Sequence, residues 1–336
     1  MPKKEMLVSL IMPIKNLESY ISETLQSIVQ QNYQNWELII INDHSEDGTE
    51  AILHQYALQD ERITFHSNLG NGIIPALQLG LHLSKGQYIS RFDGDDIMPP
   101  NRLKLMVEAL STAKPKTIVT GKVKYFSDES ISAGYKKYEN WLNERIDQND
   151  HWEWVYRECV IASPNWMARK ADLLNMGRFN ELSYPEDYDL VLQWYQHGFE
   201  VKGIPVTTLH WREHPERTSR NSDHYQQPAF FGLKIKHFVK NDLGNATLIV
   251  WGTDKKGRLT KAILDELETP FTWMDLVVPN NTHQIMEQPV LDYRTIEKLQ
   301  HFKLLITVFP TTHQRQALAR YLHELGLYHG RDYHYL

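Results

Sequence analysis

Apolar runs of strand length alternate with amphipathic helical segments at the start of this chain, and this alternation restricts its fold more than any other feature. Strands are expected at residues 7–12, 36–41, 63–66 and 88–92. The run at 36–41 is apolar at nearly every position, which is typical of strands buried on both faces of a parallel sheet. The strand–helix–strand succession predicts an α/β fold built on a mostly parallel, Rossmann-like sheet.

Three of these strands end in polar loops, which follow Met12, Ile41 and Phe92. In open α/β sheets, ligands bind at the carboxyl ends of the strands. The three loops are therefore expected to share one edge of the sheet and to form the functional site. Within the first loop, Asn16 is the expected N-cap of the helix that follows.

The most informative loop is Asp93-Gly94-Asp95-Asp96, which carries three carboxylates in four residues. Because like charges repel, isolation of this loop in a core is not expected, and a cation should lie between the carboxylates. Mg²⁺ and Mn²⁺ prefer oxygen ligands and bind one or two carboxylates together with substrate phosphates. The alternative is an acidic surface turn that caps the helix expected after Pro100.

A length of 336 residues suggests two domains. We expect a first domain at residues 1–243 and a second, smaller Rossmann-like domain at residues 244–336, because the pattern restarts after Gly244. The loop at residues 251–258 lacks the middle glycine of Gly-x-Gly-x-x-Gly, so dinucleotide binding is not expected there. The strands expected in this domain lie at residues 246–251, 271–278 and 302–309.

Composition excludes several classes of protein. The net charge of −6 argues against a surface that binds nucleic acid everywhere, although it allows local basic patches. The single cysteine, Cys159, rules out an internal disulfide and fits a reducing compartment. The first residues lack the apolar segment of a signal peptide, and no run approaches the roughly 18 apolar residues of a membrane span. We expect a cytoplasmic protein, either free or peripheral at the inner face of the membrane.

Four stretches resemble family 2 glycosyltransferases of the GT-A fold, and they occur in the order and spacing of that family. They lie at residues 8–16, 42–49, 93–96 and 185–190. Any one of the four is a weak signal, whereas the four in order are specific. The resemblance covers roughly residues 6–220 and implies an inverting, metal-dependent hexosyltransferase that uses a nucleotide-sugar, most of all a UDP-sugar.

By this resemblance, most donor-binding residues lie in the loops at the strand ends. Pro13 and the residues after it would line the nucleotide pocket, Asp43 would accept from the uracil or the ribose, and Asp93 would face the ribose. The family usually has two successive acids where this chain has Asn42 before Asp43. The alternatives are an Asx turn for Asp43 and an ion pair with a neighbouring aspartate for Arg91. The expected donor-binding residues are Pro13, Asn16, Asp43, Ser45, Asn68, Arg91, Asp93 and Arg212.

The metal ligands implied by the resemblance are Asp93, Asp95 and His214. Asp95 would bind the Mn²⁺ or Mg²⁺ that bridges the two phosphates, because a divalent ion neutralises charge as the glycosidic bond breaks. His214 lies where the family often has Tyr-Arg-x-His, and it would complete the metal shell or contact the diphosphate. Arg212, Arg217 or Arg220 would neutralise phosphate oxygens. A surface loop of mixed charge is the alternative for this run.

Asp187 is the expected general base, because it lies where the family places the carboxylate that deprotonates the acceptor hydroxyl. One base in a single displacement gives inversion of configuration. Glu186 is expected to support the base. The alternative is structural, since both acids follow Pro185 in a first helical turn, where the helix dipole favours acidic residues.

Two acceptor classes fit this pattern. One is a glycan or lipid-linked intermediate of surface polysaccharide assembly. The other is a modified base in tRNA, because segments at 137–143, 251–258 and 330–335 make the full chain similar to the eukaryotic galactosyltransferases that modify queuosine in tRNA, also described as β-1,3-N-acetylglucosaminyltransferase-like proteins. The alternative to an RNA-binding face is a solvated helix and loop. The basic residues expected to face RNA phosphates are Lys234, Lys236, Lys240, Lys255, Lys256, Arg258 and Lys261.

Two further interpretations stay open from the sequence. The aromatic stretch from Trp141 to Tyr156 is either packing or a platform on which the acceptor stacks. The chain could also be a nucleotide-sugar-binding scaffold without activity. The presence of Asp93, Asp95 and Asp187 together argues against a scaffold.

Overall fold

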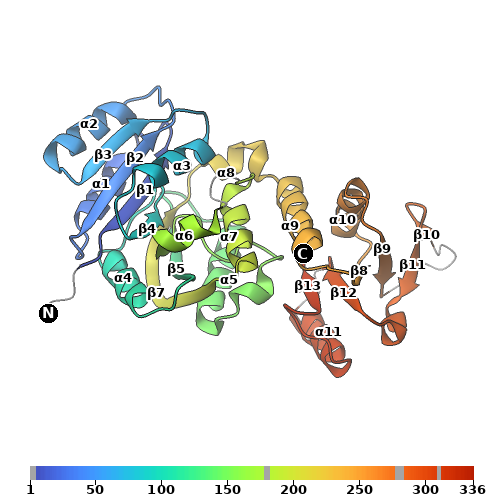
Figure 1. The fold of residues 1–336 in the computed structure, drawn as a ribbon. Helices are drawn as coiled ribbons and strands as arrows, with labels where there is room; N and C mark the ends of the chain where they lie inside the picture. Colours follow the sequence, from blue (N-terminus) through green and yellow to red (C-terminus); the bar gives the residue numbers. More distant parts are fainter. Residues whose placement is uncertain (1–4, 178–181, 277–283, 309–311) are drawn as a thin grey trace. The chain divides into compact units, whose positions relative to one another are not determined.

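The computed structural model describes residues 5–177, 182–276, 284–308 and 312–336, and these residues contain two separate sheets (Figure 1). By internal contacts, the chain divides into two compact units. The first unit comprises Met1–His151, Val160–Leu182 and Gln193–Asn221, and the second comprises Trp152–Cys159, Ser183–Leu192 and Ser222–Leu336. All strands of the first sheet precede residue 243 in the sequence, and all strands of the second sheet follow it. The second compact unit also includes residues before 243, at 152–159, 183–192 and 222–242.

The first sheet has seven strands in the order β3-β2-β1-β4-β6-β5-β7. Strands β1 to β4 are parallel, and β6 is antiparallel to both of its neighbours. This arrangement confirms the mostly parallel α/β sheet that the strand–helix alternation predicts. The strands are β1 (Val8–Ile14), β2 (Trp36–Asn42), β3 (Ile63–Ser67), β4 (Tyr88–Arg91), β5 (Thr117–Phe126), β6 (Trp166–Arg169) and β7 (Glu200–Arg212).

Helices cover both faces of this sheet, because successive strand residues point to opposite sides. Leu10 and Leu38 belong to a core cluster with residues of α1, α2 and α4. Ile39 and Ile41 pack instead with Ala76 of α3. The helices of this region are α1 (Ile21–Val29), α2 (Thr49–Gln59), α3 (Ile73–Leu83), α4 (Arg102–Ser111), α5 (Ala133–Gln148), α6 (Lys170–Met176) and α8 (Thr218–Asn221).

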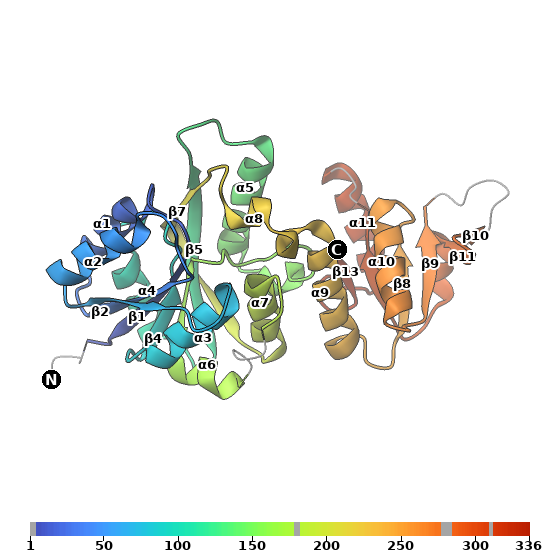
Figure 2. The same ribbon diagram turned by 90° about the horizontal axis from the view of Figure 1, so that it is seen from above.

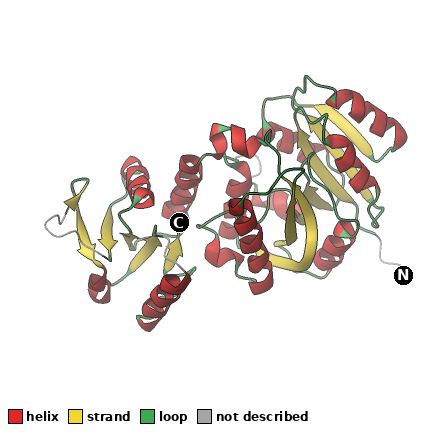
Figure 3. Cartoon of the chain, turned by 180° about the vertical axis from the view of Figure 1, so that it is seen from behind, coloured by secondary structure: helices red, strands yellow, loops and turns green. Residues whose placement is uncertain are grey.

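The second sheet has six strands in the order β10-β11-β9-β8-β12-β13 and is parallel except for β10 (Figure 3). Helices α10 and α11 cover its opposite faces (Figures 1 and 2). The strands are β8 (Thr247–Trp251), β9 (Phe271–Asp275), β10 (Gln284–Ile285), β11 (Gln288–Asp292), β12 (Phe302–Ile306) and β13 (Tyr333–Tyr335). The longer helices are α9 (Gln227–Asn241), α10 (Lys255–Glu266) and α11 (Thr312–Glu324).

The second sheet confirms the small Rossmann-like domain. The first strand, β8, lies in the middle of the sheet, with β9 on one side and β12 on the other. The strand order therefore reverses beside β8, which is the topological switch point of a Rossmann-like sheet. Two of the expected strands, at 271–278 and 302–309, end in residues that lie outside the described part of the chain. The remaining elements are the helix α7 (Glu186–Gln196) and the 3₁₀ helices η1 (His151–Trp154), η3 (Asp223–Tyr225) and η4 (Tyr293–Lys298).

Close packing of α3 on β1 gives a test of the first core. A Cβ added at Gly80 would lie 2.3 Å from Ile11 Cγ2. Gly80→Ala should lower the free energy of unfolding by about 1–3 kcal/mol, because overpacking outweighs the roughly 1 kcal/mol that alanine gains in a helix. In α9, a Cβ at Gly232 meets no atom within 4 Å, so Gly232→Ala should be neutral or stabilising. Denaturant unfolding measures both, and a gain in both variants would contradict this packing.

Candidate functional site

The carboxyl ends of β1 to β4 lie along one edge of the first sheet. Ile14 is paired with Asn42, and Asn42 with Ser67, so the loops that follow β1, β2 and β3 begin side by side. Strand β4 runs parallel to β1 on its other side. The expected grouping of the loops after Met12, Ile41 and Phe92 at one edge is therefore confirmed.

Reciprocal hydrogen bonds join the loops after β1 and β2. The backbone N–H of Asn16 donates to Ser45 Oγ at 2.9 Å, and the N–H of Glu46 donates to Asn16 Oδ1 at 2.8 Å. Asn16 has a left-handed backbone with a φ of 52°, and α1 begins only at Ile21. The predicted N-cap is therefore wrong, because the Asn16 amide connects two loops. Pro13 is half-buried within β1.

Asp43 is buried at the end of β2 and orders the loop after β3. Its Oδ1 accepts from Asn68 Nδ2 at 2.6 Å and from the Gly72 N–H at 3.0 Å. Asn68 is also buried, and its Nδ2 donates to the Gly72 carbonyl. Lys15 Nζ lies 3.9 Å from Asp43 Oδ2. The structure thus brings Asp43 and Asn68 together, and the Asp43 carboxylate orders the loop after β3.

The acidic loop after β4 is surrounded by arginines. Arg91 Nε donates to Asp93 Oδ1 at 2.8 Å, which is the ion pair considered for Arg91. Gly94 allows the loop to approach the loop after β1, because an added Cβ would lie 2.7 Å from Ile14 Cγ2 and from Leu17 Cδ1. The cationic partners expected between these carboxylates are supplied at least in part by the chain itself.

Asp96 corrects the expectation that this loop avoids the core. Its side chain is fully buried, and its Oδ1 accepts from the Arg212 N–H at 2.8 Å. Burial, followed by the charges of Asp95 and Asp93, raises the pKa of Asp96 well above its usual range, whereas the charge of Arg217 opposes the shift. A carboxyl group that holds its proton avoids most of the cost of burying a charge.

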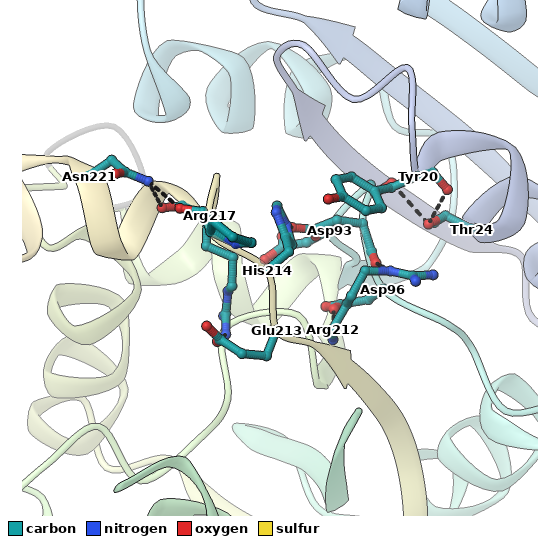
Figure 4. Close-up of polar contacts among 12 residues, drawn as sticks. Tyr20, Thr24, Asp93, Asp96, Arg212, Glu213, His214, Arg217 and Asn221 are labelled. Atoms are coloured by element: carbon teal, nitrogen blue, oxygen red, sulfur yellow. Dashed lines mark hydrogen bonds and ion pairs between the residues drawn. The ribbon is translucent and has the colours of Figure 1, made fainter. Parts of the chain in front are cut away.

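Asp95, in the loop after β4, lies close to His214, in the segment after β7. His214 Nε2 lies 2.9 Å from Asp95 Oδ2. An antiparallel bridge between Ile97 and His210 fixes β7 beside the acidic loop, so the segment after β7 returns to Asp95. In Figure 4, His214 lies between Asp93 and Arg217.

Arg212, at the end of β7, binds the acidic loop and α1. Its Nε donates to the Asp95 carbonyl at 2.7 Å, and its Nη2 contacts Glu23. The guanidinium carbon lies 4.5 Å from the Phe126 ring centroid and 5.3 Å from that of Tyr20. These contacts make Arg212 part of the support of the loop, and its contact with phosphate stays a prediction.

The donor set around Asp95 fits a divalent ion that binds together with a diphosphate. Among the described residues, no group of three or more His, Cys, Asp or Glu side chains is arranged to hold a metal ion. Asp95 and His214 already converge, whereas Asp93 is turned toward Arg91. One carboxylate and one imidazole leave most of an octahedral shell to phosphate oxygens and water.

The expected general base lies at the start of α7, in the second unit. Asp187 is half-buried, and its Oδ1 accepts from the Tyr188 N–H at 2.8 Å. Its neighbours Glu186 and Asp189 are buried and bind to Tyr225 and His237, respectively. Glu186 is therefore held in the protein interior, and its role in supporting the base stays a prediction.

The aromatic stretch divides between the two units. On α5, Tyr138 and Trp141 are stacked at 5.9 Å and pack against the core cluster that contains Trp211. Trp152 and Trp154 belong to the second unit, where Trp154 stacks on Tyr335 at 5.6 Å. These contacts favour packing, the first of the two interpretations, for Trp141 and Trp154.

The basic face expected on α9 and α10 is interrupted. Lys234 is buried, and its Nζ donates to the Arg157 carbonyl at 3.1 Å. Lys256 Nζ donates to Leu336 O, and Lys261 pairs with Asp265. Lys234 therefore does not face solvent, which corrects the set of residues assigned to RNA phosphates.

Comparison with known proteins finds a family that is similar to the first part of the chain. Residues 9–175 match the model of the family "Glycosyl transferase family 2". The matched residues make up just under half of the chain. The match ends before Asp187 and before the segment after β7.

Several glycosyltransferases are similar to longer parts of the chain. An uncharacterized glycosyltransferase of Haemophilus influenzae is 29% identical over 78% of this chain and 85% of its own length. The putative colanic acid biosynthesis glycosyl transferase WcaA of Escherichia coli is 26% identical over 70% of this chain and 91% of its own length. The match covers a smaller share of other relatives, for example 60% of the length of glycosyltransferase GlyG of Streptococcus pneumoniae.

A solved structure confirms the fold. Residues 1–349 of Staphylococcus aureus TarS superpose with a TM-score of 0.54 at 17% identity, over 71% of this chain and 68% of that one. The chain therefore has a GT-A glycosyltransferase fold with a second α/β domain. In the part of the chain that the structure describes, no helix is long and apolar enough to cross a membrane.

The buried lysine of α9 predicts a pH effect. Burial lowers the pKa of Lys234 to about 7, whereas the unfolded side chain titrates near 10.4. Between these values the unfolded chain binds more protons, so this residue makes the stability rise with pH from about 7 to 10. Lys234→Met should remove that rise. Unfolding free energies at several pH values test this, with exposed Lys236→Met as the control, and a constant difference from wild type would contradict it.

Proposed function

We propose that this protein is an inverting glycosyltransferase that moves a hexose from a UDP-sugar to an acceptor hydroxyl. The observation that supports it most is the pairing of Asp95 with His214 at the carboxyl edge of a family 2 domain, beside the Asp43–Asn68 cluster. The structure of S. aureus TarS, which shares the fold, was determined in complex with UDP-GlcNAc. That complex supports a UDP-linked donor.

The loops after β1 to β4 bind the nucleotide in this proposal. Pro13 and Asn16 shape one wall, and Ser45 fixes it through the Asn16 N–H. Asp43 and Asn68 are hydrogen-bonded to each other, so the side chains that contact the uridine are already ordered. They therefore lose little conformational freedom when the nucleotide binds. Asp93, oriented by Arg91, faces the ribose.

Asp95 and His214 are the residues that would hold Mn²⁺ or Mg²⁺ beside the diphosphate, and Asp93 would add a further carboxylate nearby. The ion supplies positive charge at the diphosphate, which becomes the leaving group. Arg212 keeps Asp95 in place through the loop carbonyl, at 2.7 Å.

Asp187 takes the proton of the acceptor hydroxyl. The acceptor oxygen forms a bond to the anomeric carbon while the bond from that carbon to the phosphate oxygen breaks, and the pair of electrons leaves with UDP. The single displacement inverts the anomeric configuration. Placing the base on a first helical turn costs little, because the helix N-terminus favours a carboxylate there.

The acceptor in this proposal is a glycan or lipid-linked intermediate of surface polysaccharide assembly, and the reaction takes place in the cytoplasm. The similarity to WcaA, a putative colanic acid biosynthesis glycosyl transferase, over 91% of its length supports a glycan acceptor. Burial of Lys234 weakens the case for a tRNA acceptor, since that case needs a continuous basic face.

Substitution of the base Asp187 and of the metal-site residue Asp95 tests the proposal. Asp187→Asn should lower sugar transfer by about 10²- to 10⁴-fold, because a general base contributes on that order, and should leave UDP affinity unchanged. Asp95→Asn should weaken UDP binding in Mn²⁺ and have little effect in EDTA. Calorimetry with UDP and release of UDP from a panel of UDP-sugars measure these effects.

Exposed Asp223 in η3 provides a matched control, and Asp223→Asn should behave as wild type. Wild-type transfer by both Asp187→Asn and Asp95→Asn would refute the assignment of the site. Binding of UDP without any turnover by the wild-type protein would favour a scaffold.

The acceptor class follows from the distribution of label. The protein, Mn²⁺ and radiolabelled UDP-sugars are incubated with a cell extract, which is then divided into RNA, lipid and soluble glycan. We expect label in lipid or glycan. Label that is released by ribonuclease would instead identify a tRNA-modifying enzyme.

A further inference from the structure

The turn that carries Asp187 is held by side chains from η3 and α9. Tyr225 Oη donates to Glu186 Oε2 at 2.5 Å, and His237 Nε2 lies 2.7 Å from Asp189 Oδ1. Both acids are buried, with 1% and 3% of their surface exposed. One contact therefore lies one residue before Asp187, and the other lies two residues after it.

Further contacts fix the same turn within the second unit. The Ser183 N–H donates to Asp189 Oδ2 at 2.8 Å, so this carboxylate joins the approach to α7 with α9. Tyr188 Oη donates to the Val155 carbonyl at 2.6 Å, and its ring lies 5.9 Å from that of Phe230. The acids at positions 186 and 189 share one face of the helix because they are three residues apart.

Helix α9 is itself anchored on the small sheet. Phe238 contacts Tyr156 edge to face at 5.4 Å and His334 of β13 at 5.7 Å. His237 is the adjacent residue and faces Asp189. The C-terminal sheet, α9 and the first turn of α7 are thus connected by direct contacts inside one compact unit.

We infer that Tyr225 and His237 are positioning residues for the general base Asp187, an inference that rests on the proposed function. Their hydrogen bonds fix the backbone on both sides of Asp187 and thereby the direction of its carboxylate. A base must lie within hydrogen-bond distance of the proton that it takes, and a displacement of about 1 Å lowers a rate by about 10²-fold. The role of the C-terminal domain is then to hold the base through α9.

Three substitutions test this role in the full chain, with UDP release from the most active UDP-sugar as the assay and water or the identified acceptor as the nucleophile. Tyr225→Phe removes one oxygen, and His237→Leu removes the ring nitrogens. Each should lower kcat by about 10- to 100-fold while the KM for the donor and the Kd for UDP stay within about twofold. His237→Gln, which keeps an N–H donor, should restore most of the loss.

Tyr321→Phe is the matched control, because it also removes a Tyr–Glu hydrogen bond in the second unit, from Tyr321 Oη to Glu297 Oε1 at 3.2 Å. It should leave kcat unchanged. A wild-type kcat in both Tyr225→Phe and His237→Leu would overturn the inference, and so would an equal loss in Tyr321→Phe.

Double variants separate positioning from general stability. In an Asp187→Asn background there is no base to orient, so Tyr225→Phe and His237→Leu should lower the residual rate no further. A further loss of the same size would show a merely structural role and overturn the inference. If the wild-type protein turns over no UDP-sugar, the proposed function fails, and the positioning roles fail with it. If the wild-type protein is active and Tyr225→Phe and His237→Leu both keep its kcat, only the positioning roles are refuted.

Discussion

Burial of a carboxyl group in the loop after β4 is the constraint on which the candidate donor site depends. Asp96 lies in the core of the first unit, where an ionised carboxylate would be costly, and it is compensated by the Arg212 N–H, by the charge of Arg217 and by a raised pKa. Because Arg212 also binds the Asp95 carbonyl, this one anchor fixes the loop to the end of β7. The approach of His214 to Asp95 follows from that anchor.

The chain order of strands and helices was enough to predict the parallel sheets and the edge at which the polar loops meet. That prediction succeeded because hydrophobic periodicity is a local property and parallel strands place their carboxyl ends together. The pairing of Asp95 with His214 could be expected only from the family resemblance, since 119 residues separate the two side chains. The N-cap at Asn16 failed because the Asn16 side-chain oxygen accepts from the Glu46 N–H of another loop, and this contact outweighed the local preference.

Other features could not be read from the sequence because they depend on which charged groups the fold buries. Nothing local distinguishes Asp96 from Asp95, or Lys234 from Lys236, yet one of each pair is in the interior. Arg102 is fully buried as well, and burial lowers its pKa to about 9, against the opposing charge of Asp96. The number of charged residues does not indicate which of them the fold buries. An amphipathic helix can also bury one lysine without a visible change in its sequence pattern, because the long apolar stem of the lysine side chain packs well.

The two acidic clusters of the chain follow the same physical arrangement. In Asp93-Gly94-Asp95-Asp96, the last carboxyl is buried and holds the backbone, while Asp95 keeps part of its surface exposed. In the first turn of α7, Glu186 and Asp189 are buried against Tyr225 and His237, while Asp187 between them is only half-buried. A carboxylate that must change partners during a reaction needs rigid support and an accessible face. Neighbouring acids that take their own partners from the protein provide that support, and this explains why each cluster contains more carboxylates than the proposed chemistry uses.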